Sequence, residues 1–423
     1  MNIFKKTIFT GFAPNLTASD VFISLGYLLP WNWPEIINGQ DVESAEKKLE
    51  SYFKIRSANV FDSGRSALYF SLKALDIKEG DEVLIQAYTC VVVTNAIRWV
   101  GAKPVYVDIR NDFNMDVVDL EKKITNKSKV LIIQHTFGLS AELNELINTA
   151  KKHGLRVVED CAHSFGLAKD KKLTGTFGDI GMFSFGSDKI LSCVRGGALI
   201  TDNQELADKI CKLKNDLPDP DFKVTLQHLM HGPIFFIGKK LYGLVIGKAI
   251  LALAKKCNLI NKIIYKEEKK GLQVDFYPAK MANSLATILL KQIEDVLVVN
   301  GHRQLIAKFY NKNLKNDKVE KVWADDKINK DNCVYLRYPI LTDSPNDLLR
   351  YAKKHGIILG NWYDRVVAPR DIDFEKTGYV KGNCPNAEVL ASRSVNLPTN
   401  RHIKIEDAIR VVELVNKYMV SKE

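Results

Sequence analysis

The sequence predicts an α/β fold in which a doubly wound, mostly parallel sheet is followed by a smaller C-terminal α+β domain. Between residues 59 and 202, short apolar segments of strand length alternate with longer helical segments. The segment Val130-Leu131-Ile132-Ile133 is apolar at every position. Strands with two apolar faces are typical of a parallel sheet covered by helices on both sides. Repeated βα alternation also implies right-handed crossovers between parallel strands.

The elements of this sheet follow one another from residue 59 onward. The expected strands cover residues 59–61, 82–85, 104–107, 130–134, 156–159, 183–185 and 198–201. Two expected helices begin at Ser66 and at Thr94, and two more cover residues 117–124 and 143–153. Together these elements predict a large N-terminal domain over residues 1–216.

Residues 217–275 differ in composition and predict a basic, apolar helical insertion. The segment opens with the helix breaker LPDPDF, and ten lysines against two glutamates lie between Phe222 and Gly271. On a helix, Lys240, Lys248 and Lys255 fall within about a quarter of a turn, which leaves the remaining surface apolar. This pattern is typical of a helix lying in an anionic membrane surface, here through residues 222–270. A helical hairpin packed on the protein or on a second subunit explains the same pattern.

Residues 276–423 predict a long helix followed by the small α+β domain. Over residues 279–311, apolar side chains recur at helical spacing, among them Leu285, Leu289 and Leu297. The later elements are a strand at 332–340, a helix at 346–355, a strand at 357–358 and a helix at 405–419.

Composition restricts the class of protein. The chain has 423 residues, of which 46% are hydrophobic and 26% charged, as is typical of a folded protein with a large core. Its net charge of +11 suits a phosphorylated substrate or an anionic surface. Nucleic acid is not an expected partner, because the lysines of the insertion lie among aliphatic rather than base-stacking aromatic residues.

Cysteine usage and apolar run lengths predict the compartment. The seven cysteines show no CxxC spacing, which favours a reducing compartment and predicts neither a disulfide framework nor a metal site. We expect no secretory signal and no membrane span, because no apolar run is long enough for either. The sequence therefore predicts a cytoplasmic protein, with peripheral contact to the inner membrane surface if the insertion binds lipid.

A glycine corner follows the first strand of the sheet. In Asp62-Ser63-Gly64-Arg65-Ser66, the corner leads into a helix that Ser66 is able to cap. The backbone N–H groups and the positive end of such a helix form a cradle suited to a phosphate group. A Ser-Gly pair that only caps the helix is the alternative interpretation.

Two further strand ends carry ionisable side chains. Asp160 follows an apolar strand and is placed to hold a ring nitrogen protonated through a charge-assisted hydrogen bond, while His163 lies three residues later. A buried structural ion pair is the alternative for Asp160. Ser184 lies on the next strand and Lys189 follows it, where a partly desolvated amine forms a Schiff base with an aldehyde readily. A phosphate loop, an acid and a lysine in this order are the arrangement expected of a pyridoxal 5'-phosphate (PLP) enzyme.

Seven stretches of the chain carry a resemblance to a known family. They are SGRSALYFSLKAL, GDEVLIQAYTC, GAKPVYVDI, HTFGLSAELNEL, AKKHGLRVVEDCAHSFG, GTFGDIGMFSF with the lysine and GGALITDN that follow, and CPNAE with the later LP. In this order the stretches resemble the DegT/DnrJ/EryC1/StrS family, the fold-type I PLP-dependent aminotransferases that act on keto sugars attached to nucleotides. The resemblance covers the chain from about residue 40 to its end, apart from the basic insertion.

The resemblance implies a role for each matching residue. Lys189 matches the lysine that binds the cofactor covalently and then moves the substrate proton, and Asp160 matches the acid at the pyridine nitrogen. His163 matches the position beside the ring. Ser184 and the Gly64-Arg65-Ser66 turn match the phosphate contacts.

The chain departs from the family pattern at several positions. Arg65 replaces a threonine, Cys90 stands where an aromatic residue often stacks on the cofactor ring, and Arg195 replaces a glutamate. Pro278 stands where the family has an asparagine that reaches the phosphate of the neighbouring subunit.

The segment Gly360-Asn361-Trp362-Tyr363-Asp364-Arg365 matches a family stretch that lines the substrate site. Trp362, Tyr363 and Arg365 are therefore candidate substrate contacts, and a plain loop of the small domain is the alternative.

The resemblance implies transfer of an amino group from an amino acid, glutamate in the family, to a keto sugar in amino-sugar and cell-surface polysaccharide biosynthesis. It also implies a homodimer with the active site at the subunit interface. Two alternatives stay open: other PLP chemistry, such as the dehydrating branch in which a histidine replaces Lys189, and a membrane-surface protein that kept the fold without turnover.

Overall fold

A seven-stranded sheet lies at the centre of the larger half of the molecule. The structure is a computed structural model that describes residues 6–323 and 333–419. The strands are β2 (Ser57–Phe61), β3 (Glu82–Gln86), β4 (Lys103–Val107), β5 (Ser128–Gln134), β6 (Arg156–Asp160), β9 (Ile180–Ser184) and β10 (Gly197–Thr201), in the spatial order β2-β10-β9-β6-β5-β3-β4. β10 is antiparallel to both of its neighbours, and the other adjacent pairs are parallel. The predicted doubly wound, mostly parallel sheet is confirmed.

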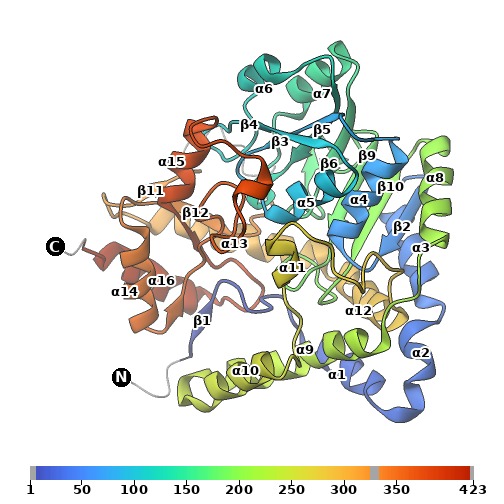
Figure 1. Cartoon of the computed structure of the whole chain (residues 1–423). Helices are drawn as coiled ribbons and strands as arrows, with labels where there is room; N and C mark the ends of the chain where they lie inside the picture. The colour runs from blue at the N-terminus through green and yellow to red at the C-terminus, as the bar shows by residue number, and fades with distance from the viewer. Residues whose placement is uncertain (1–5, 324–332, 420–423) are drawn as a thin grey trace.

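Helices cover both faces of this sheet (Figure 1). They are α3 (Asp41–Phe53), α4 (Gly64–Ala74), α5 (Val91–Trp99), α6 (Val117–Lys123), α7 (Leu143–Lys152) and α8 (Gln204–Asn215). Val130 and Ile132 pack in the same core as α4 and α5, whereas Leu131 and Ile133 pack with α7. The continuous apolar run of β5 therefore arises because successive side chains enter two different cores.

The start of α4 lies two residues earlier than the sequence predicts. Ser63, and not Ser66, is the N-cap residue, and its Oγ accepts a hydrogen bond from the Ser66 N–H at 3.3 Å. The prediction that Ser66 caps this helix is wrong, because two serines three residues apart offer the same capping chemistry. α5 likewise begins at Val91 rather than at Thr94.

The smaller half combines a three-stranded sheet with helices from the end of the chain. Its strands are β11 (Glu320–Lys321), β12 (Tyr338–Leu341) and β14 (Ser394–Leu397), and its helices are α14 (Pro345–Lys354), α15 (Pro385–Arg393) and α16 (Ile405–Lys417), with a 3-10 turn, η5, at Glu375–Thr377. The expected strand at 332–340 begins on Asn332, outside the described residues, and its described part is shorter and starts at Tyr338. β1 (Ile8–Phe9) pairs in parallel with β13 (Ile357–Ile358), so the start of the chain joins this half.

The predicted long helix over 279–311 is wrong, because the structure has two helices there. α12 (Asn283–Glu294) and α13 (Val296–Asn313) meet at Asp295, whose N–H bonds to the Gln292 carbonyl three residues back at 3.3 Å. The Asp295 carboxylate pairs with Arg401 at 2.9 Å. The buried face of α12 continues in α13 through Val296, Val299 and Arg303, and Leu297, which lies off that face, is 73% exposed.

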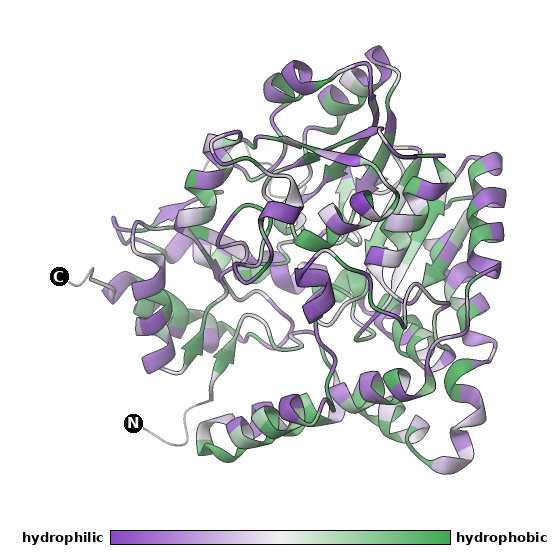
Figure 2. Ribbon diagram, in the orientation of Figure 1, coloured by the Kyte–Doolittle hydropathy of each residue, from purple (hydrophilic) through white to green (hydrophobic). Residues whose placement is uncertain are grey.

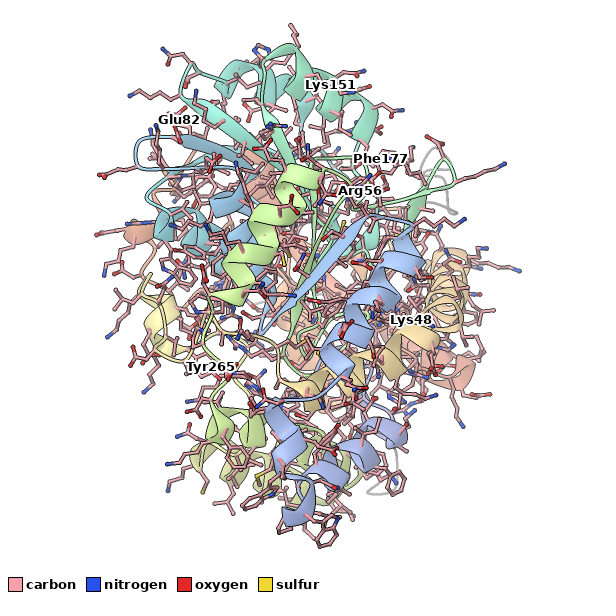
Figure 3. All side chains as sticks on the ribbon, turned by 90° about the vertical axis from the view of Figure 1, so that its right-hand side faces the viewer. Lys48, Arg56, Glu82, Lys151, Phe177 and Tyr265 are labelled. Carbon is pink, nitrogen blue, oxygen red and sulfur yellow. The ribbon has the colours of Figure 1, made fainter. Side chains whose placement is uncertain are left out.

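The predicted insertion is helical and lies beside the first helices of the chain. α9 (Phe222–Lys240), η3 (Tyr242–Leu244), α10 (Ile246–Lys256) and α11 (Lys266–Lys269) follow α8, and α9 packs on α1 (Ala18–Tyr27) and α2 (Pro34–Ile37), which are separated by η1 (Pro30–Asn32). Figure 3 shows α9 and α10 with α1 below the body of the molecule, and Tyr265 on the segment that leads back to it. Among the described residues, no helix is both long enough and apolar enough to cross a membrane. The division at residues 216 and 275 stays a prediction.

Two leucines on either side of Asp295 test which face of α12 and α13 is buried. Leu289 is 0% exposed, so Leu289→Ala should lower the free energy of unfolding by about 2–5 kcal/mol. Leu297→Ala should change it by less than about 0.5 kcal/mol, because the side chain is mostly in solvent. Urea denaturation of both variants measures the difference, and equal losses would contradict the burial of this face.

Candidate active site

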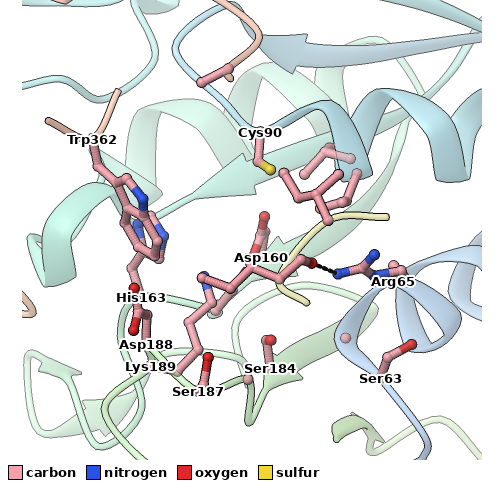
Figure 4. Close-up of a pocket in the computed structure, with 18 of the residues that line it drawn as sticks. Ser63, Arg65, Cys90, Asp160, His163, Ser184, Ser187, Asp188, Lys189 and Trp362 are labelled. Atoms are coloured by element: carbon pink, nitrogen blue, oxygen red, sulfur yellow. Dashed lines mark hydrogen bonds between the residues drawn. The ribbon is translucent and has the colours of Figure 1, made fainter. Parts of the chain in front are cut away.

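A cavity of about 250 Å³ lies beyond the carboxyl ends of the central strands. Ser63 and Gly64 follow β2, Asp160 ends β6 and Ser184 ends β9, and all of them line it. Figure 4 shows Ser63 and Arg65 on one side of the pocket and Trp362 and His163 on the other, with Asp160 and Lys189 between them. Parallel strands place their carboxyl ends along one edge, which explains why distant segments meet here.

The start of α4 approaches Ser184 very closely. A Cβ atom on Gly64 would lie 2.6 Å from the Ser184 Cβ and 2.8 Å from its Oγ, and one on Gly197 would lie 2.5 Å from the Ser63 carbonyl oxygen. Only glycines allow the helix end, the serine hydroxyl and the start of β10 to share this corner. The free N–H groups of the first turn form an anion cradle. Ser66, one of the predicted phosphate contacts, is not among the residues that line the cavity.

Asp160 is buried, with 3% of its surface exposed. Its Oδ1 accepts a hydrogen bond from the Ala162 N–H at 3.0 Å. Among the described residues, Oδ2 receives no hydrogen bond, and the side chain borders the cavity. Burial raises the pKa of this carboxyl, against the lowering effects of the Ala162 N–H, Lys189 and His135. The free oxygen is placed to bind a protonated nitrogen in the cavity.

Lys189 lies in the turn that joins β9 to β10. The Lys189 N–H donates to the Gly186 carbonyl at 3.0 Å, and the side-chain amide of Asn15 donates to the Lys189 carbonyl, so the backbone is held from both sides. Burial lowers the pKa of the Lys189 amine, while the nearby Asp160 carboxylate acts in the opposite direction. The fraction of neutral amine is therefore larger than for a solvated lysine at the same pH.

Aromatic rings form the wall opposite the anion cradle. The Lys189 Nζ lies 5.3 Å from the centre of the Trp362 ring, and Trp362 stacks on His163 at 5.8 Å. Burial, with the charges of Lys189 and Arg337, lowers the pKa of His163 well below its usual range. The His163 Nδ1 accepts from the Phe137 N–H at 3.4 Å, so the neutral ring carries its proton on Nε2, which faces the Tyr363 hydroxyl at 3.4 Å.

The structure brings most of the other predicted site residues to the cavity. Cys90 and Tyr363 line it, and burial raises the pKa of the Cys90 thiol. Arg65 lines it as well, but its guanidinium pairs with Glu268 and donates to the Ile263 carbonyl at 2.6 Å. Arg365 does not line it, because its guanidinium lies over the Phe374 ring at 3.8 Å and donates to the Arg370 carbonyl.

Several residues of the site were not among the sequence candidates. Arg195 was noted only as a departure from the family pattern, and Asn261 and Ile263 come from the insertion, yet all three line the cavity. Arg337 lies 3.6 Å from the centre of the Trp362 ring and pairs with Asp188 at 3.3 Å. The sequence held one signal for Arg337. Asp188 is next to Lys189, and a buried carboxylate at that position needs a cationic partner.

The residues present fit PLP. The glycine cradle at α4 with the Ser184 hydroxyl suits its phosphate, and the free Asp160 oxygen suits its ring nitrogen. Lys189 supplies an amine of lowered pKa for its aldehyde, and the neutral ring of His163 lies in the same pocket. The His163 ring and Trp362 offer flat surfaces where Cys90 offers none.

Comparisons with known proteins point to one family. A model of the DegT/DnrJ/EryC1/StrS aminotransferase family matches residues 30–232 and 251–416, and the gap between them lies inside the predicted insertion. GDP-perosamine synthase of Escherichia coli O157:H7 is 28% identical over 392 residues, which cover 91% of this chain and 92% of that protein. A UDP-N-acetyl-3-dehydro-alpha-D-glucosamine 3-aminotransferase of Acidithiobacillus ferrooxidans is 41% identical over 155 residues, 36% of this chain and 42% of that protein.

Solved structures share the fold. PseC of Helicobacter pylori, an aminotransferase of pseudoaminic acid biosynthesis, superposes with a TM-score of 0.74 at 20% identity, over 98% of this chain and 99% of that chain. NtdA of Bacillus subtilis, solved with the bound cofactor PMP, gives a TM-score of 0.74 at 22% identity, over 97% and 84% of the two chains. The predicted family, fold-type I architecture, aminotransferase class and PLP cofactor are confirmed.

A matched pair of glycine substitutions tests the corner at α4. Gly64→Ala should lower the free energy of unfolding by about 1–3 kcal/mol, because the new methyl group overlaps Ser184. Gly26→Ala, in helix α1 with no atom within 4 Å of the added Cβ, should be neutral or raise it by up to about 1 kcal/mol. Urea denaturation compares them, and a Gly64→Ala variant as stable as Gly26→Ala would refute the close approach.

Proposed function

The chain belongs to the DegT/DnrJ/EryC1/StrS aminotransferase family, and from this premise we propose that it transfers an amino group from glutamate to a nucleotide-linked keto sugar in amino-sugar or cell-surface polysaccharide biosynthesis. Its class is that of the family, a PLP-dependent aminotransferase. The observation that carries the proposal is the convergence of Lys189, Asp160 and the anion cradle of α4 on one cavity.

Each chemical task of the proposed reaction has a candidate residue in this cavity. The first turn of α4 and Ser184 would hold the phosphate of PLP, and Asp160 would hold its ring nitrogen protonated. When bound, PLP supplies an electrophilic carbon that takes up the amino group and a cationic ring that accepts an electron pair. The buried Asp160 carboxylate keeps that cationic ring in place because it is the opposite charge in a dry site.

Lys189 is the proposed proton carrier. As a neutral amine, its Nζ can accept a proton from the α-carbon of the amino donor and return one to the carbon that was the keto group of the sugar. Burial favours the neutral form, so a larger fraction of Lys189 is available as a base than of a solvated lysine at the same pH. The adjacent wall of Trp362 and Tyr363 excludes water from this atom and offers a flat surface for the sugar.

The relatives support a nucleotide sugar as the acceptor. Their names describe a GDP-perosamine synthase and an aminotransferase acting on a UDP-linked 3-keto sugar. The net charge of +11 suits a substrate that carries a diphosphate. The segment with Trp362 and Tyr363 would contact the sugar, whereas Arg365 lies outside the cavity wall and would act only at its rim.

The alternatives have less support. Dehydration chemistry in this family belongs to a branch with histidine in place of Lys189, and Lys189 is present here. A protein that kept the fold without turnover has no need to keep a buried amine beside a buried carboxyl, since both cost free energy in an empty cavity.

Turnover tests the proposal directly. The enzyme incubated with PLP, glutamate and a panel of nucleotide keto sugars should form 2-oxoglutarate and one amino sugar in equal amounts, measured by mass spectrometry. Lys189→Ala should remove at least about a factor of 10² to 10⁴ of the rate, because proton transfer loses its base, while circular dichroism stays unchanged. Lys47→Ala, an exposed lysine on α3, is the control and should keep full activity. Full activity of Lys189→Ala would refute the assignment.

We also propose a location: a cytoplasmic homodimer in peripheral contact with an anionic membrane surface through residues 222–270. α10 has a buried stripe and an exposed face. Gly247, Leu251 and Ala254 are buried and Ile246 and Leu253 are exposed, while Lys256 lies next to Leu253 on the exposed side and Lys248 and Lys255 border the buried stripe. An exposed face that carries both apolar side chains and lysines is the composition that favours binding among anionic headgroups.

The neighbouring N-terminal helices extend this surface. Phe22 on α1 and Trp31 on η1 are each 72% exposed, and α1 packs on α9. Tryptophan and other aromatic side chains favour the interfacial layer of a bilayer. Figure 2 shows apolar and polar residues alternating along α9 and α10 at the base of the molecule.

Vesicle sedimentation tests the membrane contact. The chain should bind vesicles containing phosphatidylglycerol more than vesicles of phosphatidylcholine alone, and added salt should weaken the binding. Ile246→Glu/Leu253→Glu should reduce binding at least about tenfold, since two aliphatic contacts are lost. The matched double variant Leu305→Glu/Val389→Glu, with equally exposed side chains on α13 and α15, should bind as the wild type does. Equal loss in both double variants would contradict this location.

A further inference from the structure

Arg195 is a buried cation without an anionic partner. It lies in the turn before β10, 4% of its surface is exposed, and it lines the active-site cavity. Its Nε and Nη2 atoms are buried and make no hydrogen bond, and no carboxylate among residues 6–323 and 333–419 forms an ion pair with it. A buried charge is costly unless an opposite charge and hydrogen-bond acceptors compensate it.

The surroundings of Arg195 stabilise a cation but do not neutralise it. The guanidinium carbon lies 4.8 Å from the centre of the Tyr277 ring, 5.5 Å from that of Tyr265 and 5.7 Å from that of Phe276. The faces of aromatic rings attract cations. All three rings come from residues after α10, and Asn261 of the same segment donates a hydrogen bond to the Val194 carbonyl at 3.3 Å. The end of the insertion, with Tyr265 and Asn261, and the two residues directly after it, Phe276 and Tyr277, thus fix the position of Arg195.

Arg65, the other arginine of this wall, is already neutralised. It pairs with Glu268, which is 0% exposed and whose Oε2 accepts from the Tyr265 N–H at 2.8 Å. Burial alone would raise the pKa of Glu268, but Arg65 and Arg195 lower it. Asp62 is the other nearby carboxyl, and burial raises its pKa against the effect of Arg195. Neither carboxyl forms an ion pair or a hydrogen bond with Arg195 among the described residues, so its guanidinium has no direct anionic partner.

The turn that carries Arg195 lies next to the anion cradle. Gly196 and Gly197 connect Arg195 to β10, and a Cβ on Gly197 would meet the carbonyl of Ser63, the N-cap residue of α4. Arg195, the first turn of α4 and Ser184 therefore line one cavity, and the backbone that carries Arg195 adjoins the cradle. A guanidinium beside a helix N-terminus and hydroxyl groups is the donor set that suits a phosphate dianion.

We propose that Arg195 binds the phosphate group of PLP and supplies its main neutralising cation from within the same subunit. This inference rests on the proposed function, and it gives the segment from Tyr265 to Tyr277, at the end of the insertion and just after it, a task in the active site. Tyr265, Phe276 and Tyr277 hold the guanidinium at the cradle, while Glu268 keeps Arg65 from competing for the same anion. Arg195 is here a binding residue, and the three rings are positioning residues.

Comparison of PLP with pyridoxal, which lacks the phosphate, tests this role. Full-length enzyme freed of cofactor is titrated with each compound, and binding is followed by absorbance. Arg195→Gln should weaken PLP binding by about 10- to 150-fold, the range for a lost hydrogen bond to a charged group, and leave pyridoxal binding unchanged. Arg195→Lys keeps the charge but not the planar fork and should lose less. Arg156→Gln, an exposed arginine on β6, is the control and should match the wild type for both compounds.

A second measurement separates this inference from the proposed function. Inorganic phosphate should raise the Tm of the cofactor-free wild type and not that of Arg195→Gln, whose own Tm should equal or exceed that of the wild type because an unpaired buried charge is gone. If phosphate acts in this way but PLP does not bind, the Arg195 site stands and the proposed function fails. If Arg195→Gln keeps the wild-type preference for PLP over pyridoxal, or loses both compounds equally, the Arg195 proposal is wrong.

Discussion

The close approach of three backbone segments at one corner is the constraint on which the active site depends. The first turn of α4, the end of β9 and the start of β10 meet where Gly64 faces Ser184 and Gly197 faces Ser63, at distances that leave no room for a Cβ atom. Because the corner is this tight, the free N–H groups of α4 open into the cavity rather than onto solvent. The same contact fixes the two ends of the turn that carries Lys189, so the amine and the anion cradle are positioned by one packing arrangement.

Burial then sets the charge of each group in the cavity. It lowers the pKa of Lys189 and raises that of Asp160, so each group is shifted toward its neutral form until a charged ligand enters. At the other end, Glu268 neutralises Arg65 and leaves Arg195 among aromatic rings. The pocket is thus electrostatically incomplete, and an anion at one end with a cationic ring nitrogen at the other would complete it. Such preorganised charges act strongly because little water is present to screen them.

The sequence predicted the sheet and most of the pocket because both depend on local patterns. Asp160 and Ser184 end apolar strands and Lys189 follows the next turn, and parallel topology alone brings them to one edge. Contacts between residues far apart in the sequence had no such signal. Arg65 pairs with Glu268, 203 positions away. This pairing makes Arg65 part of an ion pair and not a free cation for the phosphate. Arg365 faces Phe374 for a similar reason, since its neighbour in space is not set by the motif. The break at Asp295 was missed because the helical spacing of buried residues continues across it, from Ile293 to Val296 and Val299.

Chemical mapping of the cofactor attachment tests the central claim, that the amine of Lys189 stands where the cradle and Asp160 place the aldehyde of PLP. The wild-type enzyme with PLP is reduced with borohydride, digested and examined by peptide mass spectrometry. The account predicts one pyridoxyl group, recovered on the peptide that contains Lys189, and loss of the visible absorbance of the bound cofactor. A pyridoxyl group spread over several surface lysines, or absent from the Lys189 peptide, would contradict it.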